Sequence, residues 1–190
     1  MTREQTVKVT TLGRFSVRVR GKALAFGRKT PLRPLALLKY LAAHRGGEIS
    51  VVQVAEALWP DKGASALRAL AINLHRLRRL VGSTEIVIHR ERHIAIDLRH
   101  VWCDAEVFER MLDQATQARD DEERMRLIAG ALALYRGDFL SGEPSEGWIV
   151  AARERLRARY ALACAAQARQ FAAVERRQGT RAGRESVSDL

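Results

Sequence analysis

Residues 48–98 constrain the fold more than any other part of the chain, because three patterns follow one another there. A short amphipathic segment, VVQVAEAL, is closed by Pro60. A longer segment, SALRALAINLHRLRRLVG, repeats apolar residues at steps of three and four. Two alternating stretches, EIVIH and HIAID, then flank a charged tip. Steps of three and four indicate helices and strict alternation indicates strands, so the order predicted is helix, turn, longer helix and β-hairpin.

The longer helix, predicted over 64–81 with Ser65 as its cap and Gly82 as its stop, has two different faces. The apolar stripe expected to face the core is Leu67, Leu70, Leu74, Leu77 and Val81. The other face carries Arg68, Ala69, Ile72, Asn73, Arg76 and Arg79. No acidic residue occurs from position 64 to 83, so its cations are uncompensated. Such a face is destabilised unless a polyanion meets it.

Two interpretations of this basic face compete. Arg can bridge two acceptors of guanine and Asn can pair with adenine, which favours contact with DNA bases. An ordinary surface helix can also use Arg stems to cover apolar area. The neighbouring elements favour the first interpretation. They are a short helix over 51–59, with Ser50 and Gln53 at capping-box spacing, and the hairpin tip Arg90-Glu91-Arg92. The tip itself is either a solvated turn or a pair of arginines that enter a minor groove.

The charge of the chain divides it in two. The net charge is +11 over 190 residues, but residues 1–100 hold 19 Lys and Arg against 7 Asp and Glu, and residues 101–190 hold 14 against 15. This break predicts two domains with different partners, the first of them an anion. Nucleic acid fits better than an acidic membrane, because no exposed apolar face lies opposite the basic residues. Two isolated cysteines, no secretory signal and no membrane-length apolar run predict a soluble cytoplasmic protein.

Both halves contain further predicted elements. Alternating apolar residues around Gly13 predict a small antiparallel sheet, followed by a helix over 31–44 capped by Thr30. Lys29 and Arg33 at its start either reach phosphates or point to water. In the second half, helices are expected from Asp104 as N-cap, over 122–135 and from about 146, as an array of helical hairpins. The predicted division is a domain over 1–100, a helical domain over 101–177 and a disordered tail over 178–190.

Catalytic and metal-binding patterns are weak throughout. His89, His93, His100 and Cys103 form one cluster, but without a Cys-x-x-Cys pair it does not favour a zinc site. No Gly-rich phosphate loop follows a strand, and no Ser or Cys nucleophile has a companion base in a recognisable context. We therefore expect no enzyme, no cofactor and no metal.

At this point a family resemblance is specific. Leu12-Gly13, the run Arg33-Pro34-Leu35-Ala36-Leu37-Leu38, Ala57-Leu58-Trp59 and the stretch 69–80 resemble the OmpR-type winged helix of the antibiotic-regulatory-protein (SARP) family of bacterial activators. The stretches 104–109 (DAEVFE) and 133–140 (ALYRGDFL) resemble the bacterial transcriptional activator domain that follows it in that family. The resemblance covers roughly residues 7–174. It implies an α+β winged helix-turn-helix with small antiparallel sheets, then an all-α tetratricopeptide-like domain.

The resemblance also implies a function, a sequence-specific DNA-binding transcriptional regulator that activates and reads the major groove with helix 64–81. Base or phosphate contacts are expected from Arg68, Ala69, Ile72, Asn73 and Arg76. Backbone and wing contacts are expected from Lys29, Arg33, Lys62, His75, Arg79, Arg90 and Arg92. RNA polymerase is a possible partner of the 59–64 loop, and copies of the chain could associate on direct repeats.

One departure from the family pattern keeps an alternative open. The family has Gly and Tyr at the return of its wing, whereas this chain has Arg90-Glu91-Arg92-His93-Ile94. Without Gly a positive-φ turn is difficult, and Glu91 would repel a phosphate, so the tip does not favour minor-groove entry. The alternative is a protein-interaction module whose winged helix no longer reads DNA and whose helical half docks a partner.

Overall fold

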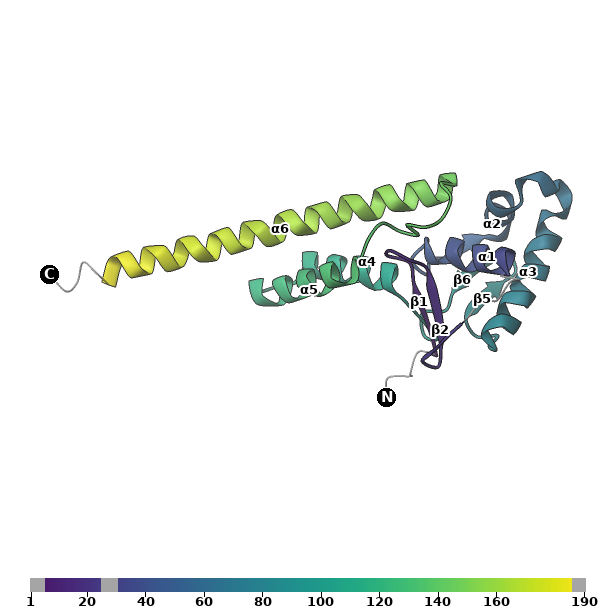
Figure 1. Cartoon of the computed structure of the whole chain (residues 1–190), viewed down its shortest axis with the longest axis horizontal. Coiled ribbons are helices and arrows are strands. Elements are labelled where there is room, and N and C mark those ends of the chain that lie inside the picture. The colour runs from purple at the N-terminus through teal and green to yellow at the C-terminus, as the bar shows by residue number, and fades with distance from the viewer. Residues whose placement is uncertain (1–5, 25–30, 186–190) are drawn as a thin grey trace.

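The computed structural model describes residues 6–24 and 31–185. Two small sheets and three helices form the N-terminal half, and three helices form the C-terminal half (Figure 1). The N-terminal elements are β1 (Val7–Thr10), β2 (Ser16–Val19), β3 (Lys22–Ala23), α1 (Leu32–Ala42), β4 (Ile49–Ser50), α2 (Val51–Leu58), the 3₁₀ turn η1 (Pro60–Ser65), α3 (Ala66–Val81), β5 (Val87–Arg90) and β6 (His93–Ile96). The remaining elements are β7 (Val101–Cys103), α4 (Asp104–Gln117), α5 (Asp121–Leu134) and α6 (Gly147–Glu185). This order confirms the expected α+β half followed by a helical half.

The two sheets have different roles. The N-terminal sheet has the order β3-β2-β1-β7, in which β1 is antiparallel to β2 and parallel to β7. Because β7 begins at Val101, this sheet includes residues from both sides of the predicted division at 100, and that division stays a prediction. The second sheet, β4-β6-β5, holds the predicted hairpin in a register that pairs Val87 with Ile96 and Arg90 with His93.

Local signals placed most helix ends correctly. The Ser50 side chain accepts a hydrogen bond from the backbone N–H of Val52 and caps α2, as predicted. Gly82 ends α3 with φ of 70°, the left-handed conformation that favours glycine. The expected helix over 31–44 is α1, and its predicted cap, Thr30, lies outside the described residues. Ser65 precedes α3, but its hydroxyl donates to the Lys62 carbonyl and makes no cap hydrogen bond.

The predicted apolar stripe of α3 was wrong at one position. The buried residues of α3 are Ala66, Leu70, Asn73, Leu74, Leu77 and Val81. Leu67 lies at the edge of this stripe and is 48% exposed. The reason is helical phase: at 100° per residue, position 66 lies closer to the centre of the stripe than position 67.

The predicted N-cap role of Asp104 was also wrong. Cys103 is the N-cap of α4, and Asp104 is the first residue of the helix, buried beneath the end of β1. Its carboxylate accepts from the backbone N–H groups of Thr11 (2.7 Å) and Leu12 (3.0 Å), from the Thr11 hydroxyl (2.7 Å) and from the Ala105 N–H (2.8 Å). Burial raises the pKa of this carboxyl, and these hydrogen bonds oppose the rise. Asp104 therefore joins the first β-turn to the first helix of the C-terminal half.

A second buried carboxylate joins the two halves. Glu109 on α4 is 1% exposed, and its oxygens lie 3.2 Å from Nε of Arg155, 3.5 Å from Nε of Arg45 and 3.7 Å from Nη1 of Arg159. Arg155 also donates to the carbonyl of Ala43, just after α1, at 2.8 Å. Because α6 supplies Arg155 and Arg159, one carboxylate holds α1, α4 and α6 together.

The long helix α6 projects away from the rest of the molecule (Figure 1). It packs on α4 and α5 through its first half, where Leu156 is fully buried. It continues to Glu185, so residues 178–185, which the sequence assigned to a disordered tail, are helical, while 186–190 lie outside the description. Across the described ranges, no helix is both long and apolar enough to span a membrane.

Candidate nucleic-acid interface

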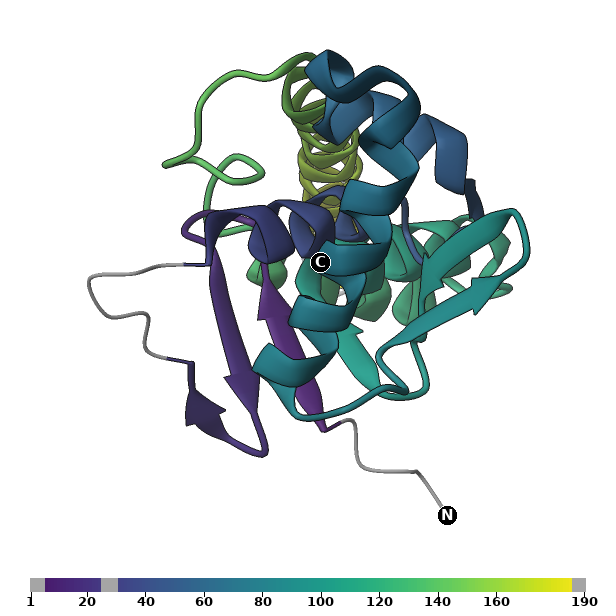
Figure 2. The ribbon, with the colours of Figure 1, turned by 90° about the vertical axis from the view of Figure 1, so that its right-hand side faces the viewer.

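The outer face of α3 is the centre of the candidate site. Viewed from this end of the molecule, α3 runs across the front, between the N-terminal sheet and the β5–β6 hairpin (Figure 2). Its exposed residues include Arg68, Ile72, His75, Arg76 and Arg79, which recur at helical spacing on the side opposite the buried stripe. The structure therefore brings together three of the predicted arginines with Ile72 and His75 on one face.

Two predicted contact residues lie elsewhere on the helix. Asn73 is only 6% exposed, and its amide donates to the carbonyl of Ala69 at 2.8 Å. Its Oδ1 is buried and has no partner in the described part of the chain. Ala69 is half-buried. The prediction that Asn73 lies on the outer face of α3 was wrong, because position 73 falls within the stripe that packs on the core.

The exposed cations of α3 are electrostatically uncompensated. Within residues 6–24 and 31–185, no ion pair joins Arg68, Arg76 or Arg79 to a carboxylate. This contrasts with the helical half, where arginines of α4, α5 and α6 pair with acidic residues. A face with several free guanidinium groups attracts anions and is stabilised when one binds.

The hairpin flanks this face, and its tip departs from what its sequence suggested. Glu91 adopts φ of 38°, so the turn contains a left-handed residue that is not glycine. The prediction that the tip could not easily form a positive-φ turn without Gly was therefore wrong. Arg92 is exposed, and Arg90 is 75% exposed, with Nη1 4.0 Å from Glu48. Arg78 of α3 donates to the carbonyl of Val87 at 3.1 Å and fixes the hairpin against the helix.

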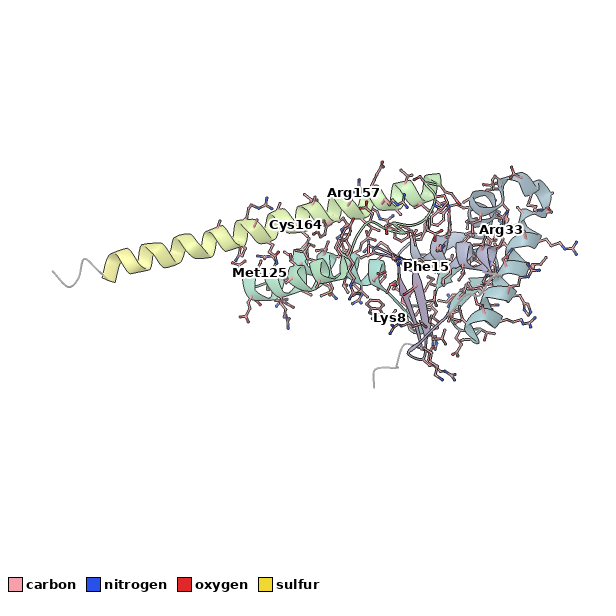
Figure 3. All side chains as sticks on the ribbon, in the orientation of Figure 1. Lys8, Phe15, Arg33, Met125, Arg157 and Cys164 are labelled. Atoms are coloured by element: carbon pink, nitrogen blue, oxygen red, sulfur yellow. The ribbon has the colours of Figure 1, made fainter. Side chains whose placement is uncertain are left out.

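The start of α1 and the turn η1 complete the basic surface. Arg33 donates to the carbonyl of Leu58 at 3.5 Å and lies at the same end of the molecule as α3 (Figure 3). Arg33 lines a groove of about 640 Å³ together with Arg76 and Arg79. Lys62 is exposed in η1, which buries none of its residues. Lys29 lies outside the described residues.

One basic residue of this surface was missed from the sequence. Arg20, in the turn between β2 and β3, lines a cleft of about 780 Å³ with His75 and Arg79. Its φ of 47° places it in a left-handed turn before Gly21. The sequence offers only the turn signal Arg-Gly. The turn lies beside the end of α3 only because of how the N-terminal sheet packs on that helix, and no local sequence pattern predicts this tertiary contact.

The described residues also bear on two other kinds of site, a metal centre and a reactive thiol. Among the residues described, no three His, Cys, Asp or Glu side chains are placed to hold a metal ion. Burial raises the pKa of the Cys103 thiol to about 12, so at neutral pH it is protonated and a poor nucleophile.

Comparison with known proteins adds two findings. Residues 103–186 match the family model of the bacterial transcriptional activator domain. The structure is similar to that of Mycobacterium tuberculosis EmbR, solved in complex with a low affinity phosphopeptide, with a TM-score of 0.72 and 20% sequence identity. The match covers 97% of this chain and 50% of the EmbR chain, so the present chain spans about half the length of that protein. A comparison with curated protein sequences gave no significant match.

These findings agree with the order of elements described above. The matched family segment begins at Cys103, where β7 ends and α4 begins, and it includes all three helices of the C-terminal half. The similarity to EmbR extends over the N-terminal half as well. Residues 103–186 of the chain therefore match the bacterial transcriptional activator domain, behind an N-terminal half whose fold is similar to that of EmbR, and both findings agree with the SARP-type resemblance of the sequence.

Proposed function

We propose that the chain is a sequence-specific DNA-binding regulator that reads the major groove with α3. In this proposal α2, η1 and α3 form the helix-turn-helix, and β5–β6 is the wing. The observation that carries it is the outer face of α3, on which Arg68, Arg76 and Arg79 are exposed without an acidic partner in the described chain. An α-helix fits the major groove, and free guanidinium groups match both its guanine acceptors and its phosphates.

The face divides into reading and positioning residues. Arg68 and Arg76 are proposed to contact bases or nearby phosphates, and the exposed Ile72 to contact a thymine methyl group. His75, Arg79 and Arg20 line one cleft at the end of α3 and are proposed to hold the phosphate backbone. Because Asn73 is buried, it is proposed to position the helix and is not given a base contact.

The surrounding cations extend this backbone contact. Arg33 contacts the last residue of α2, and Lys62 lies in the turn that follows it; both are exposed, so both can reach phosphates beside the groove. Arg92 at the hairpin tip has no ion pair within the described chain and can contact a phosphate directly. Arg90 must first give up its contact with Glu48. The wing is therefore proposed to contact the backbone and not to penetrate the minor groove.

We further propose that the regulator activates transcription in the cytoplasm. Two features support this: the match to the bacterial transcriptional activator domain, and the 59–64 loop, in which residues 60–64 are exposed while Trp59 is buried, so that a surface is left for RNA polymerase beside the DNA. Binding as tandem copies on direct repeats is proposed from the SARP-type resemblance.

Salt dependence of affinity tests the proposal. Binding of the purified chain to a labelled duplex is measured by fluorescence anisotropy at several salt concentrations. With several phosphate contacts, we expect log Kd to rise steeply with log salt, by roughly 0.9 per phosphate neutralised. Arg76→Ala is expected to cost about 1–3 kcal/mol. An affinity that salt barely changes would contradict the proposal and favour the protein-interaction module.

A further inference from the structure

A second cationic site lies on the outer face of the N-terminal sheet, the face that does not pack on the core. The inner face of this sheet buries Val7, Val9 and Val17, so the alternating residues Lys8 and Arg18 face outward. Figure 3 shows Lys8 on the side of β1 that is turned away from α3. This outer face borders a cleft of about 620 Å³, which also includes the end of α5 and the loop after it.

Four cationic side chains line this cleft, and two of them lie directly opposite each other on neighbouring strands. Lys8 and Arg18 are direct cross-strand partners, and like charges in that position destabilise a sheet. Arg14, in the β1–β2 turn, and Arg136, after α5, line the same cleft. Among the residues that the structure describes, no ion pair joins any of these four side chains to a carboxylate. Four cations are thus gathered without compensation.

The remaining walls add hydrogen-bonding and aromatic groups. The hydroxyls of Thr10 and Ser16 lie 2.6 Å apart in the row next to Lys8 and Arg18. Trp102 on β7 lies beside Lys8, whose Nζ is 4.3 Å from the centre of the indole ring. The one acidic residue in the lining, Asp104, is buried and its oxygens are occupied by backbone and hydroxyl donors. Because these donors occupy its oxygens, Asp104 forms no ion pair with any of the four cations of the cleft.

We propose that this cleft binds the phosphoryl groups of a small soluble ligand. Three guanidinium groups present paired donors that match phosphoryl oxygens, and the two hydroxyls and Lys8 supply further donors. A volume of about 620 Å³ is in the range of small-molecule sites. The bound anion relieves the repulsion between Lys8 and Arg18, so binding stabilises the sheet to which β7 connects the C-terminal half. The site is separate from α3 and does not depend on DNA binding.

Calorimetric titration with pyrophosphate and with ATP, at constant ionic strength in chloride, tests the proposal. Pyrophosphate presents phosphoryl groups alone, and ATP adds a nucleoside and a third phosphoryl group, so tighter binding of ATP would show that the cleft recognises more than a pyrophosphate unit. We expect both to bind, and Arg14→Gln with Arg18→Gln to weaken binding by about a hundredfold, as expected for hydrogen bonds to charged groups. Arg119→Gln with Arg126→Gln, at two exposed arginines outside the cleft, is the matched control and should bind as the parent does.

A second readout locates the site. The indole N–H resonance of Trp102, assigned with Trp102→Phe, should shift on addition of pyrophosphate in the parent and in the Arg119/Arg126 control. Equal affinities of the parent and the Arg14/Arg18 variant would overturn the proposal, as would no binding of either probe. Citrate or a polyglutamate peptide that binds as tightly as pyrophosphate would show a general anion surface and would also overturn it.

Discussion

Replacing Arg68 and Arg76 together by glutamate is expected to abolish specific DNA binding. Each arginine removed should cost about 1–3 kcal/mol, and each glutamate adds repulsion from the phosphates. The combined loss should therefore be about 4 kcal/mol or more, roughly a thousandfold in Kd. Both side chains are exposed on α3 and have no ion pair within the described chain, so the fold should be retained.

The control is a double variant with the same change in charge. Arg119→Glu with Arg126→Glu alters two exposed arginines of the helical half, which have no ion-pair partner among the described residues. Its affinity should fall much less, by long-range electrostatics that salt screens. Circular dichroism and anisotropy on both variants separate folding from binding. Equal loss in the two would mean that net charge, and not the face of α3, determines affinity.

The second large effect is expected at Glu109, the carboxylate that joins the two halves. Glu109→Ala should lower the free energy of unfolding by about 3 kcal/mol, since it removes the buried partner of three arginines, of which only Arg45 and Arg159 keep a second carboxylate, that of Asp113. We take the lower part of the usual range because Arg45, Arg155 and Arg159 are partly exposed and can be rehydrated. Urea denaturation of the whole chain measures the change.

Glu154→Ala is the matched control for Glu109→Ala. Glu154 lies on the same helix as Arg155 but is exposed, and a surface substitution of this kind usually changes stability by less than about 0.5 kcal/mol. If Glu109→Ala also stayed below about 1 kcal/mol, the carboxylate would not be what holds α1, α4 and α6 together. Apolar packing alone would then connect the two halves.

The sequence was sufficient for features that depend on local chemistry. Ser50 as a cap, Gly82 as a helix stop and the paired strands of the hairpin follow from residue type and spacing, and the structure has all of them. Helical periodicity also identified most of the cationic face of α3. It placed Asn73 on the wrong side, because polar character was taken as a sign of exposure, whereas the phase of the helix decides burial.

Features that depend on distant partners were not predictable in the same way. Asp104 was expected to cap its own helix, but its carboxylate accepts hydrogen bonds from the backbone N–H groups of Thr11 and Leu12, more than ninety residues away. Arg20 joins the surface of α3 only through the position of the N-terminal sheet. Glu109 is charged within an amphipathic segment, and only the convergence of three arginines explains its burial. Each depends on tertiary packing that leaves no periodic signal.

Selection of bound duplexes from a random DNA pool tests the central claim most directly. It is carried out at two salt concentrations, with the parent chain and with Arg76→Ala. The account predicts an enriched motif, two spaced copies of it, weaker recovery at the higher salt, and relaxed preference at one base pair in Arg76→Ala. Recovery of DNA without an enriched motif, or equal losses on all sequences with Arg76→Ala, would contradict base reading by the face of α3.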